Sequence, residues 1–260
     1  MTVFGISMVK DEADIIAGTI RHMAGECDQL IVADNNSTDG TRKILDELAY
    51  ELPNLTVVDD PDPAYYQSAK MTALANLAAA EGATWIVPFD ADELWTSAHR
   101  IADVLPGLDV PVADAPLFNH LRTACDVDHS DPFTSMVWRQ PHPGKLHKVA
   151  FRFEQGAVIH QGNHGVTLPS GSVSVPALEI RHYPVRSPEQ FIRKAINGAN
   201  AYAQTDLPQS QGEHWRSYGQ LYDRFGEQGL TEVYFEHWWY RSPTDAGLVR
   251  DPAPYRRWSR

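Results

Sequence analysis

The sequence predicts an α/β protein whose central sheet is mainly parallel and flanked by helices. Short apolar runs, typical of buried strands, alternate in the N-terminal part of the chain with longer segments whose apolar residues recur at helical spacing. The connections are short, and a strand that follows a helical crossover pairs in parallel with its neighbour. The expected strands are 3–9, 30–33, 55–58 and 83–89, and the expected helices are 13–23, 41–52 and 67–80.

The turns between these elements support the same order. The first strand ends at the polar turn Lys10-Asp11-Glu12, and the second leads into residues 34–40, a run of turn-forming residues in which Asp39 is expected to cap the next helix. The third helix is rich in alanine and is closed by Gly82. No glycine-rich dinucleotide motif and no P-loop motif occurs, so a dinucleotide dehydrogenase and a P-loop NTPase are both disfavoured.

Beyond residue 105 the order becomes less regular. We expect two short strands, 157–160 and 178–183, to be antiparallel additions around a turn at Ser170-Gly171. The segment 119–144 is polar, rich in histidine and punctuated by prolines, as expected of a loop that closes over or lines a site. The further strands expected in this part are 110–117 and 148–153.

The C-terminal part predicts two helices. Ser187-Pro188-Glu189-Gln190 is a helix start with serine as the cap and proline at the first position, and this helix should run to about Ala203. A second helix is expected over 213–228, before an aromatic stretch at 234–240. The tail 250–260 is expected to be loose unless a partner holds it.

Composition and charge narrow the function. The formal net charge of −12 argues against a general nucleic-acid-binding protein or a basic membrane-surface protein. A phosphate-rich ligand would need a bound dication and a few lysines and arginines to offset this charge. No apolar run approaches the roughly 20 residues that span a bilayer, and the two cysteines, Cys27 and Cys125, form no zinc or disulfide pattern. We therefore expect a cytoplasmic protein without a membrane span.

Two carboxylates one residue apart, Asp90 and Asp92, directly follow the expected strand 83–89. Polar residues in this position lie at the carboxyl edge of a sheet, where open α/β proteins bind their ligands. Mg²⁺ and Mn²⁺ prefer oxygen ligands and are often held by one or two carboxylates together with substrate phosphates. A solvated acidic turn has the same pattern, but the place after a buried strand favours a metal site.

Several segments together resemble one enzyme family. In order and spacing, residues 8–12, 34–41 and 89–93, which follow the first, second and fourth strands, resemble the family 2 type glycosyltransferases of the GT-A fold. The resemblance extends over about residues 1–200. The segments similar to the second half of one bacterial and phage branch of this family are the strand at Lys148, His160, 180–183 and 187–191.

The resemblance implies a GT-A-like nucleotide-diphospho-sugar transferase fold with a small antiparallel addition and C-terminal helices. It implies a metal-dependent glycosyltransferase that moves a sugar from a UDP- or GDP-linked donor to a hydroxyl acceptor. Mn²⁺ or Mg²⁺ would act as a Lewis acid on the departing diphosphate, and fixed cations would add to this effect. We assign 1–105 as the nucleotide-sugar-binding half, 106–205 as the acceptor-side half of the same domain, and 206–260 as a helical and aromatic extension.

The resemblance also assigns roles to single residues. Asp92 is expected to ligate the metal, with His182 as the first choice among the histidines, and Asp90 to contact the ribose or sugar, or the metal through water. If the anomeric centre inverts, a carboxylate must accept the proton of the acceptor hydroxyl, and the sequence leaves this base open. The expected catalytic residues are Asp90, Asp92 and Glu93. The expected nucleotide-sugar-binding residues are Met8, Val9, Lys10, Glu12, Asp34, Asn35, Lys70, Asp90, Trp95, Lys148, His160 and His164. The other carboxylates open for the role of base are Asp126, Asp128, Asp131, Glu154 and Glu179.

The acceptor and two rival functions stay open at this point. The acceptor is a glycan, a small molecule or a protein Ser/Thr hydroxyl, and the aromatic residues Trp238, Trp239 and Tyr240 are interpreted as packing or homo-oligomer contacts, with an acceptor platform as the alternative. A sugar-phosphate nucleotidyltransferase is disfavoured because residues 8–12 stand where that class carries a glycine-rich basic loop. A non-catalytic carbohydrate-binding protein of the same fold is disfavoured because both aspartates after the fourth strand are intact.

Overall fold

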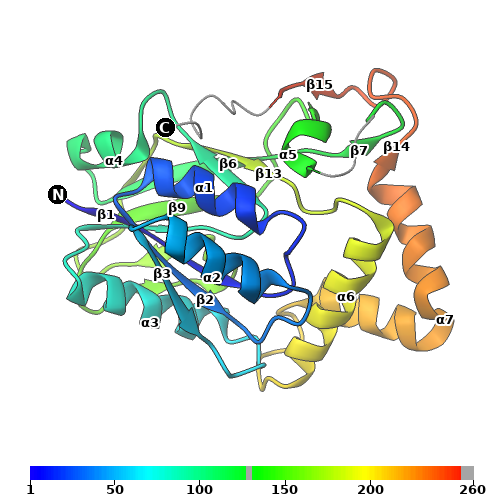
Figure 1. The fold of residues 1–260 in the computed structure, drawn as a ribbon, viewed down its shortest axis with the longest axis horizontal. Coiled ribbons are helices and arrows are strands. Elements are labelled where there is room, and N and C mark those ends of the chain that lie inside the picture. Colours follow the sequence, from blue (N-terminus) through cyan, green and yellow to red (C-terminus); the bar gives the residue numbers. More distant parts are fainter. Residues whose placement is uncertain (127–130, 253–260) are drawn as a thin grey trace.

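A nine-stranded mixed sheet forms the centre of the molecule (Figure 1). The computed structural model describes residues 1–126 and 131–252. The strands of the sheet follow the order β3-β2-β1-β4-β9-β6-β13-β5, and β12 lies beside β6. Their bounds are β1 Val3–Val9, β2 Gln29–Asp34, β3 Leu55–Asp59, β4 Trp85–Pro88, β5 Glu93–Thr96, β6 Val112–Asn119, β9 His147–Arg152, β12 Ser174–Pro176 and β13 Glu179–His182.

The first four strands of this order pair in parallel, as the alternation of strands and helices predicts. Antiparallel pairing enters with β9, which lies between β4 and β6, and returns at the far edge between β13 and β5. The prediction of an α/β fold with a mainly parallel sheet and a smaller antiparallel addition is therefore confirmed.

Helices cover both faces of the sheet. The helices α1 and α2 pack on one face and α3 packs on the other, each through its apolar residues (Figure 1). The helix bounds are α1 Ile16–Glu26, α2 Thr41–Glu51, α3 Gln67–Ala80, α4 Ile101–Val104, α5 Pro132–Ser135, α6 Pro188–Ala203 and α7 Glu213–His237, with short 3-10 turns at Leu105–Gly107 (η1) and Gln161–Asn163 (η2).

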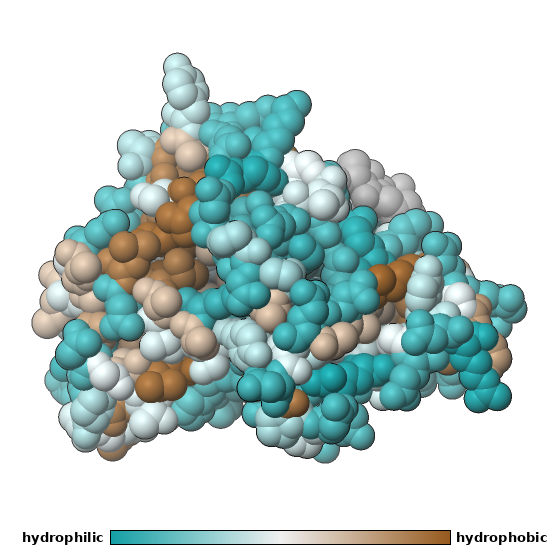
Figure 2. All heavy atoms as spheres, turned by 90° about the horizontal axis from the view of Figure 1, so that it is seen from below, coloured by the Kyte–Doolittle hydropathy of each residue, from teal (hydrophilic) through white to brown (hydrophobic). Residues whose placement is uncertain are grey.

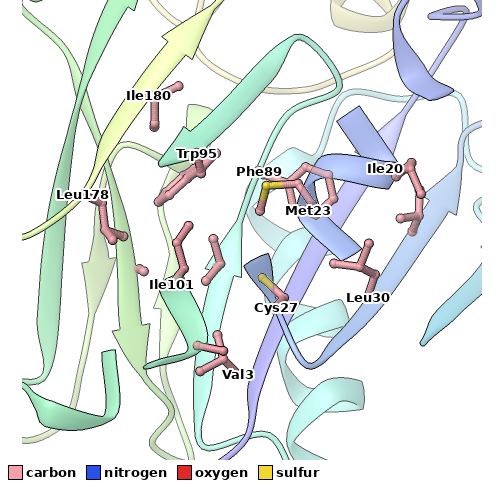
Figure 3. Close-up of a cluster of buried hydrophobic side chains, with 14 of the residues drawn as sticks. Val3, Ile20, Met23, Cys27, Leu30, Phe89, Trp95, Ile101, Leu178 and Ile180 are labelled. Carbon is pink, nitrogen blue, oxygen red and sulfur yellow. The ribbon is translucent and has the colours of Figure 1, made fainter. Parts of the chain in front are cut away.

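The sheet has a hydrophobic core on each face, and this explains why its strands are apolar almost throughout. In β1, Val3 and Val9 point into the core under α1, whereas Phe4 and Ile6 point into the core under α3. Successive side chains of a strand face opposite sides, so a strand covered on both faces cannot alternate between apolar and polar residues. Figure 3 shows the first of these cores, with Ile20 of α1 turned toward the sheet.

Two details near the N-terminus differ from the prediction. The helix α1 begins at Ile16 rather than at Ala13, because residues 12–15 form a turn in which the amide of Ile15 donates to the carbonyl of Glu12. The amide of Ala13 donates instead to the carboxylate of Asp39 at 3.0 Å. The N-cap of α2 is Gly40 rather than Asp39, although the other oxygen of Asp39 accepts from the amide of Thr41, the first residue of α2.

The middle of the chain holds more structure than the sequence predicted. The strands predicted at 157–160 and 178–183 both have antiparallel partners, but these partners are not each other: β10 (Val158–Ile159) pairs with β11 (Val166–Thr167), whereas β13 pairs with β5 in the central sheet. The predicted loop 119–144 contains β7 (Arg122–Thr123), α5 and β8 (Trp138–Arg139). The side chain of Asp131 caps α5, and a proline occupies its first turn. The predicted base Asp128 lies outside the described residues.

The C-terminal helices α6 and α7 form a pair beside the sheet (Figure 1). The helix α6 has its predicted bounds, and Ser187 accepts a hydrogen bond from the amide of Gln190 as its cap. The helix α7 continues past its predicted end at residue 228, across a kink at Gly226 (φ 62°), because Leu230 and Tyr234 pack against α6. Its end leads into β14 (Trp239–Tyr240) and later β15 (Val249–Arg250), which pair with β7 and β8.

The face of the molecule seen from below is divided between a hydrophobic and a hydrophilic side (Figure 2). Seen from below, hydrophobic residues gather on the side of α3, whereas the side of α6 and α7 is mainly hydrophilic (Figure 2). Exposed apolar side chains on α3 and the neighbouring β10 are Leu77 and Val158. Among the described residues, no helix combines the length and the apolarity that crossing a membrane requires.

Candidate functional site

The carboxyl ends of β1, β2, β3 and β4 share one edge of the sheet. Val9 pairs with Asp34, Asp34 pairs with Asp59, and Ile6 of β1 pairs with Pro88 at the end of β4. This register brings the polar segments that follow these strands together, as expected for parallel strands. The segments are 10–12, 35–36, 60–62 and 90–92.

Asp90 is held by two side chains from distant parts of the chain. The strand β9 runs antiparallel to β4, so its early residue Lys148 reaches the end of β4, where the ammonium contacts Asp90 Oδ2. The amide of Asn163 donates to Asp90 Oδ1 at 3.0 Å. Burial raises the pKa of Asp90 above its usual value, although Lys148 acts in the opposite direction. Both oxygens of Asp90 are therefore fixed in direction.

Asp92 is the second carboxylate of the pair and is almost fully buried. Its Oδ2 lies 2.5 Å from the ammonium of Lys194 on α6 and 3.7 Å from Nε2 of His182 at the end of β13. Burial alone raises the pKa of Asp92, but the neighbouring Lys194 and His182 outweigh it and hold this pKa well below the usual range. Asp92 is thus a carboxylate at neutral pH.

Glu93 supports this arrangement from inside the protein. It has no exposed surface, and its Oε2 accepts from the amide of Asp90 and from the indole N–H of Trp95, both at 3.0 Å. Its Oε1 lies 2.7 Å from the ammonium of Lys148. Glu93 therefore fixes the turn that carries the two aspartates.

Glu12, at the turn after β1, belongs with Asp90, Asp92 and Glu93 to one group of charged side chains, which we call the network. Its carboxylate contacts the guanidinium of Arg186, which also binds Asp14, and lies 3.7 Å from Lys194. Burial raises the pKa of Glu12, although Arg186 and Lys194 act against it. Lys194 therefore lies between two carboxylates, those of Asp92 and Glu12.

One face of α6 closes the site on the side of the β1 turn. The amide of Asn197 donates to Asp11 Oδ2 at 2.7 Å, and Arg193 donates to the carbonyl of Asp11 at 3.4 Å. Below them, the ring of Tyr202 lies 4.8 Å from that of Tyr65, which follows β3. The helix is thereby tied to the segments that follow β1 and β3.

A second polar group lies at the ends of β2 and β3. The amide of Asn35 donates to Asp60 Oδ2 at 2.8 Å, and Lys70 on α3 forms an ion pair with the same residue at 2.7 Å. The ammonium of Lys10 lies 2.7 Å from the carbonyl of Asn35. Asp34 is buried, and its Oδ1 has no hydrogen-bond partner among residues 1–126 and 131–252. An unpaired buried oxygen is costly, so this one is expected to face a donor group of a ligand.

Some predicted site residues lie elsewhere. Trp95 is completely buried among Ile101, Leu178 and Ile180 (Figure 3), so its indole has no free face for a sugar. The prediction that Trp95 binds the sugar is therefore wrong. It failed because the edge strand β5 is covered on both faces, so an aromatic residue there is part of the core.

The two predicted histidines of the β10–β11 region differ. His160 is exposed and its Nε2 lies 2.9 Å from the hydroxyl of Thr167 in the same hairpin. His164 follows Asn163, and its Nδ1 contacts the carbonyl of His147, while burial lowers its pKa. Only His164 is close to the Asp90 group. Met8 and Val9 are the last residues of β1, and the carbonyl of Val9 accepts from the amide of Asn35.

The residues around Asp92 fit a divalent cation. One ligand atom each of Asp92, Glu93 and His182 lie within 4.8 Å of one another. Nδ1 of His182 lies 2.8 Å from Asn119 Oδ1, and with the proton on Nδ1 the lone pair of Nε2 faces Asp92, as in metal-bound histidines. Ion pairs join six carboxylates to four cations here, and one dication would balance the excess. The carboxylates are Glu12, Asp14, Asp39, Asp90, Asp92 and Glu93, and the cations are Lys148, Arg186, Arg193 and Lys194.

The other carboxylates named as bases have structural partners. Asp126 forms an ion pair with Arg122, Asp131 caps α5, and Glu154 accepts from the amide of Ser170. Glu179 lies at the first residue of β13, at the opposite end from His182. None of these contacts joins the network around Asp92.

The sequence did not predict four members of the network. These are Asp14, Asn163, Arg186 and Lys194. Lys194, Arg186 and Asn163 lie far along the chain from the aspartates that they contact, Lys194 and Asp92 being 102 residues apart. The signal that could have found Lys194 is helical spacing, because Arg193, Lys194 and Asn197 form a polar face on α6 beside the apolar side of Phe191 and Ala195.

Comparison with known proteins identifies one family. Residues 6–168 match the family model described as glycosyl transferase family 2. A comparison with curated proteins gave no match. Among solved structures, the chain is similar to the mannosyltransferase PcManGT from Pyrobaculum calidifontis in complex with GDP-Man and Mn²⁺, with a TM-score of 0.48, 17% identity, and coverage of 94% of this chain and 77% of that one.

Two further structures are more distant. S. aureus TarS in complex with UDP gives a TM-score of 0.39 at 12% identity, covering 88% of this chain and 73% of that one. A nucleotidyl transferase from Methanothermobacter gives a TM-score of 0.31 at 15% identity, covering 46% of this chain and 62% of that one. At these levels of similarity the structures add nothing on substrates, and the family match carries the assignment.

Proposed function

The chain belongs to glycosyl transferase family 2 and is a glycosyltransferase, and from this premise we propose that it moves a sugar from a UDP- or GDP-linked donor to a hydroxyl acceptor with the help of Mn²⁺ or Mg²⁺. The observation that carries the proposal is the pair Asp90 and Asp92 at the shared edge of β1–β4, each aligned by a lysine from a distant element. The family match also disfavours the two rival functions, nucleotidyl transfer and carbohydrate binding without catalysis.

We assign the metal to Asp92 and His182. When bound there, the metal would act as a Lewis acid on the diphosphate and favour its departure. Asn119 supports this role because it fixes the tautomer of His182. Asp90, with both oxygens directed by Lys148 and Asn163, is proposed to accept hydrogen bonds from the ribose or the transferred sugar.

We assign the nucleotide to the ends of β2 and β3. The unpaired Oδ1 of Asp34 suits the ring N–H of either uracil or guanine, so it supports both UDP- and GDP-linked donors. Asn35, Lys10 and Lys70 surround this position through the contacts described above. The interaction of the lysines with the donor phosphates is part of the same proposal.

Glu93 receives a positioning role in place of the catalytic one predicted from the sequence. A base must reach the acceptor hydroxyl, and the carboxylate of Glu93 is enclosed and already contacts Lys148 and Trp95. Whether the anomeric centre inverts, which group would then act as the base, and which acceptor is used stay open. The bacterial and phage branch, the cytoplasmic location and oligomer formation through the C-terminal aromatic residues stay predictions.

Thermal shift of the purified protein tests the proposal. The panel combines UDP, GDP, UDP-glucose and GDP-mannose, each with Mn²⁺ or with EDTA, because a ligand that binds only the folded state raises the melting temperature. At least one nucleotide should give a shift that EDTA removes, and its sugar should be hydrolysed slowly without an acceptor. The absence of any shift, or pyrophosphate release from a sugar 1-phosphate and a nucleoside triphosphate, would contradict the proposal.

A further inference from the structure

Lys194 occupies a position that the proposed reaction does not explain. Its ammonium lies 2.5 Å from Asp92 Oδ2, 3.4 Å from the carbonyl of Pro184 and 3.7 Å from Glu12 Oε1. The lysine side chain is 26% exposed, so one side of it reaches solvent. An ammonium donates three hydrogen bonds, and only the contacts with Asp92 and Pro184 are short enough to be hydrogen bonds, so one N–H is left for a further acceptor.

The ammonium contacts the carboxylate oxygen that faces His182. A dication bound to Asp92 and His182 would meet a like charge in direct contact with one of its ligands, and like charges at this distance repel strongly in a partly buried site. The metal and the Lys194–Asp92 ion pair therefore compete for the same carboxylate.

Lys194 has a second partner that keeps it at the site when it leaves Asp92. Glu12 lies on the other side of the ammonium and is itself fixed by Arg186. The backbone of α6 is held by Ser187 at its start and by Asn197, which binds Asp11. A lysine side chain can change partners by rotation of its flexible stem, with no movement of the helix.

We propose that Lys194 switches partners during the reaction: it neutralises Asp92 in the free enzyme, is displaced by the metal, and then binds the diphosphate of the nucleotide sugar. The inference rests on the proposed function and adds a diphosphate-binding residue to it. The metal must displace the ammonium of Lys194 from Asp92, and the diphosphate can bind the displaced ammonium. Metal and nucleotide therefore bind cooperatively, each increasing the affinity of the other.

Calorimetry with Mn²⁺ and with UDP or GDP separates the two roles of this lysine. We compare the wild type with Lys194→Met, which removes the charge, Lys194→Arg, which keeps it, and Lys43→Met, a matched control on α2 whose side chain is 81% exposed. Without nucleotide, Lys194→Met should bind Mn²⁺ about tenfold more tightly than the wild type, since the competing cation is gone. At saturating Mn²⁺ the same variant should bind the nucleoside diphosphate about tenfold more weakly.

The two remaining variants show which part of the change in affinity is due to the charge of Lys194. Lys194→Arg should bind Mn²⁺ within about threefold of the wild type, and Lys43→Met should match the wild type in both titrations. Thermal unfolding checks that each variant folds. If Lys194→Met does not fold, Lys194→Gln, which keeps a hydrogen-bond donor near Asp92, serves instead and should shift both affinities in the same directions.

Three results would overturn the inference in different ways. If the wild type binds nucleotide with Mn²⁺ but the neutral variants bind Mn²⁺ no more tightly, Lys194 does not compete with the metal, and the proposed function stands without it. If the neutral variants bind Mn²⁺ more tightly but the diphosphate equally well, the lysine does not reach the phosphates. If the wild type binds no nucleotide with any metal, the proposed function fails together with the inference.

Discussion

The edge of the sheet beyond β1–β4 and the α6–α7 pair are held together by opposite kinds of contact. At the edge, buried carboxylates and cations form two neighbouring groups of ion pairs, one around Lys148 and one around Arg186 and Lys194. Between α6 and α7, the contacts are apolar and aromatic, among them Phe191, Leu230 and Tyr234. Buried ion pairs add little net stability because desolvation offsets their attraction, whereas apolar burial is clearly stabilising. The comparison indicates that the edge is built for binding and the helix pair for support.

The helix α6 belongs to both regions. Phe191 and Ala195, four residues apart, face α7, whereas Lys194 and Asn197 face the network. The apolar side therefore determines where the lysine is placed. Changes on the two sides of this helix should affect different properties, and the predictions below test that division.

Asp92→Asn should have the largest effect on activity. The amide is nearly isosteric but is a poor metal ligand, so transfer should fall by at least about 10³-fold, or about 4 kcal/mol of transition-state stabilisation. Lys194 keeps Glu12 as a partner, so the free energy of unfolding should fall by only about 1 kcal/mol. Steady-state turnover and thermal unfolding measure the two effects. Asp46→Asn on the exposed side of α2 is the control, and unchanged turnover of the Asp92 variant would refute the metal assignment.

Phe191→Ala should have the largest effect on stability. The ring is buried and lies 5.2 Å from that of Tyr218 on α7, and its removal should lower the free energy of unfolding by about 3–4 kcal/mol. Phe225→Ala, at an exposed position of α7, should change it by less than about 0.5 kcal/mol. Urea unfolding followed by intrinsic fluorescence gives both values. A fall of the same small size in both variants would show that the helix pair is not held by its apolar side.

The comparison also explains which features the sequence could predict. Asp90 and Asp92 are visible because they follow a strand directly, and the edge at which parallel strands end is known without a structure. The bounds of α6 are visible because Ser187 and Pro188 mark its start locally. In each case the signal and the feature lie within a few residues of each other.

The rest of the site depends on contacts between distant segments. Lys194 and Asn163 reach the aspartates only through the packing of α6 and the turn η2, which no local pattern encodes. The burial of Trp95 and Glu93 depends on β13, which pairs with β5 from much later in the chain. The kink in α7 at Gly226 preserves the contacts of Leu230 and Tyr234, so tertiary packing overrides a local break.

His120→Phe should isolate the pH dependence of stability that one buried histidine contributes. The ring of His120 is buried, stacks on Tyr183 at 4.4 Å, and burial lowers its pKa from 6.5 to about 4. The unfolded chain then takes up a proton below pH 6.5 that the folded chain takes up only below about 4, so stability falls as the pH falls through this window. The wild type should lose about 2 kcal/mol more than the variant between pH 7 and pH 5.

Urea unfolding at several pH values measures this difference. The carboxylates whose pKa values are lowered, Asp39 and Asp92, lose their stabilisation only at lower pH, because a group with a depressed pKa stays ionised until the pH approaches it. Burial also lowers the pKa of His164 and His214, but both are present in wild type and variant and cancel in the comparison. Parallel pH curves for the two proteins would show that His120 is not the group responsible.

Asn163→Gly should give the smallest effect and tests the network alone. Asn163 is fully buried with a φ of 59°, a conformation that glycine adopts freely, so the substitution removes the hydrogen bond to Asp90 without straining the backbone. Asp90 should then be less well oriented, and turnover should fall about tenfold, equivalent to about 1.4 kcal/mol. Asn163→Ala removes the same hydrogen bond but adds strain of about 1–2 kcal/mol. The two variants should therefore have the same turnover per folded molecule but different melting temperatures. Equal stability together with wild-type turnover would place Asn163 outside the network.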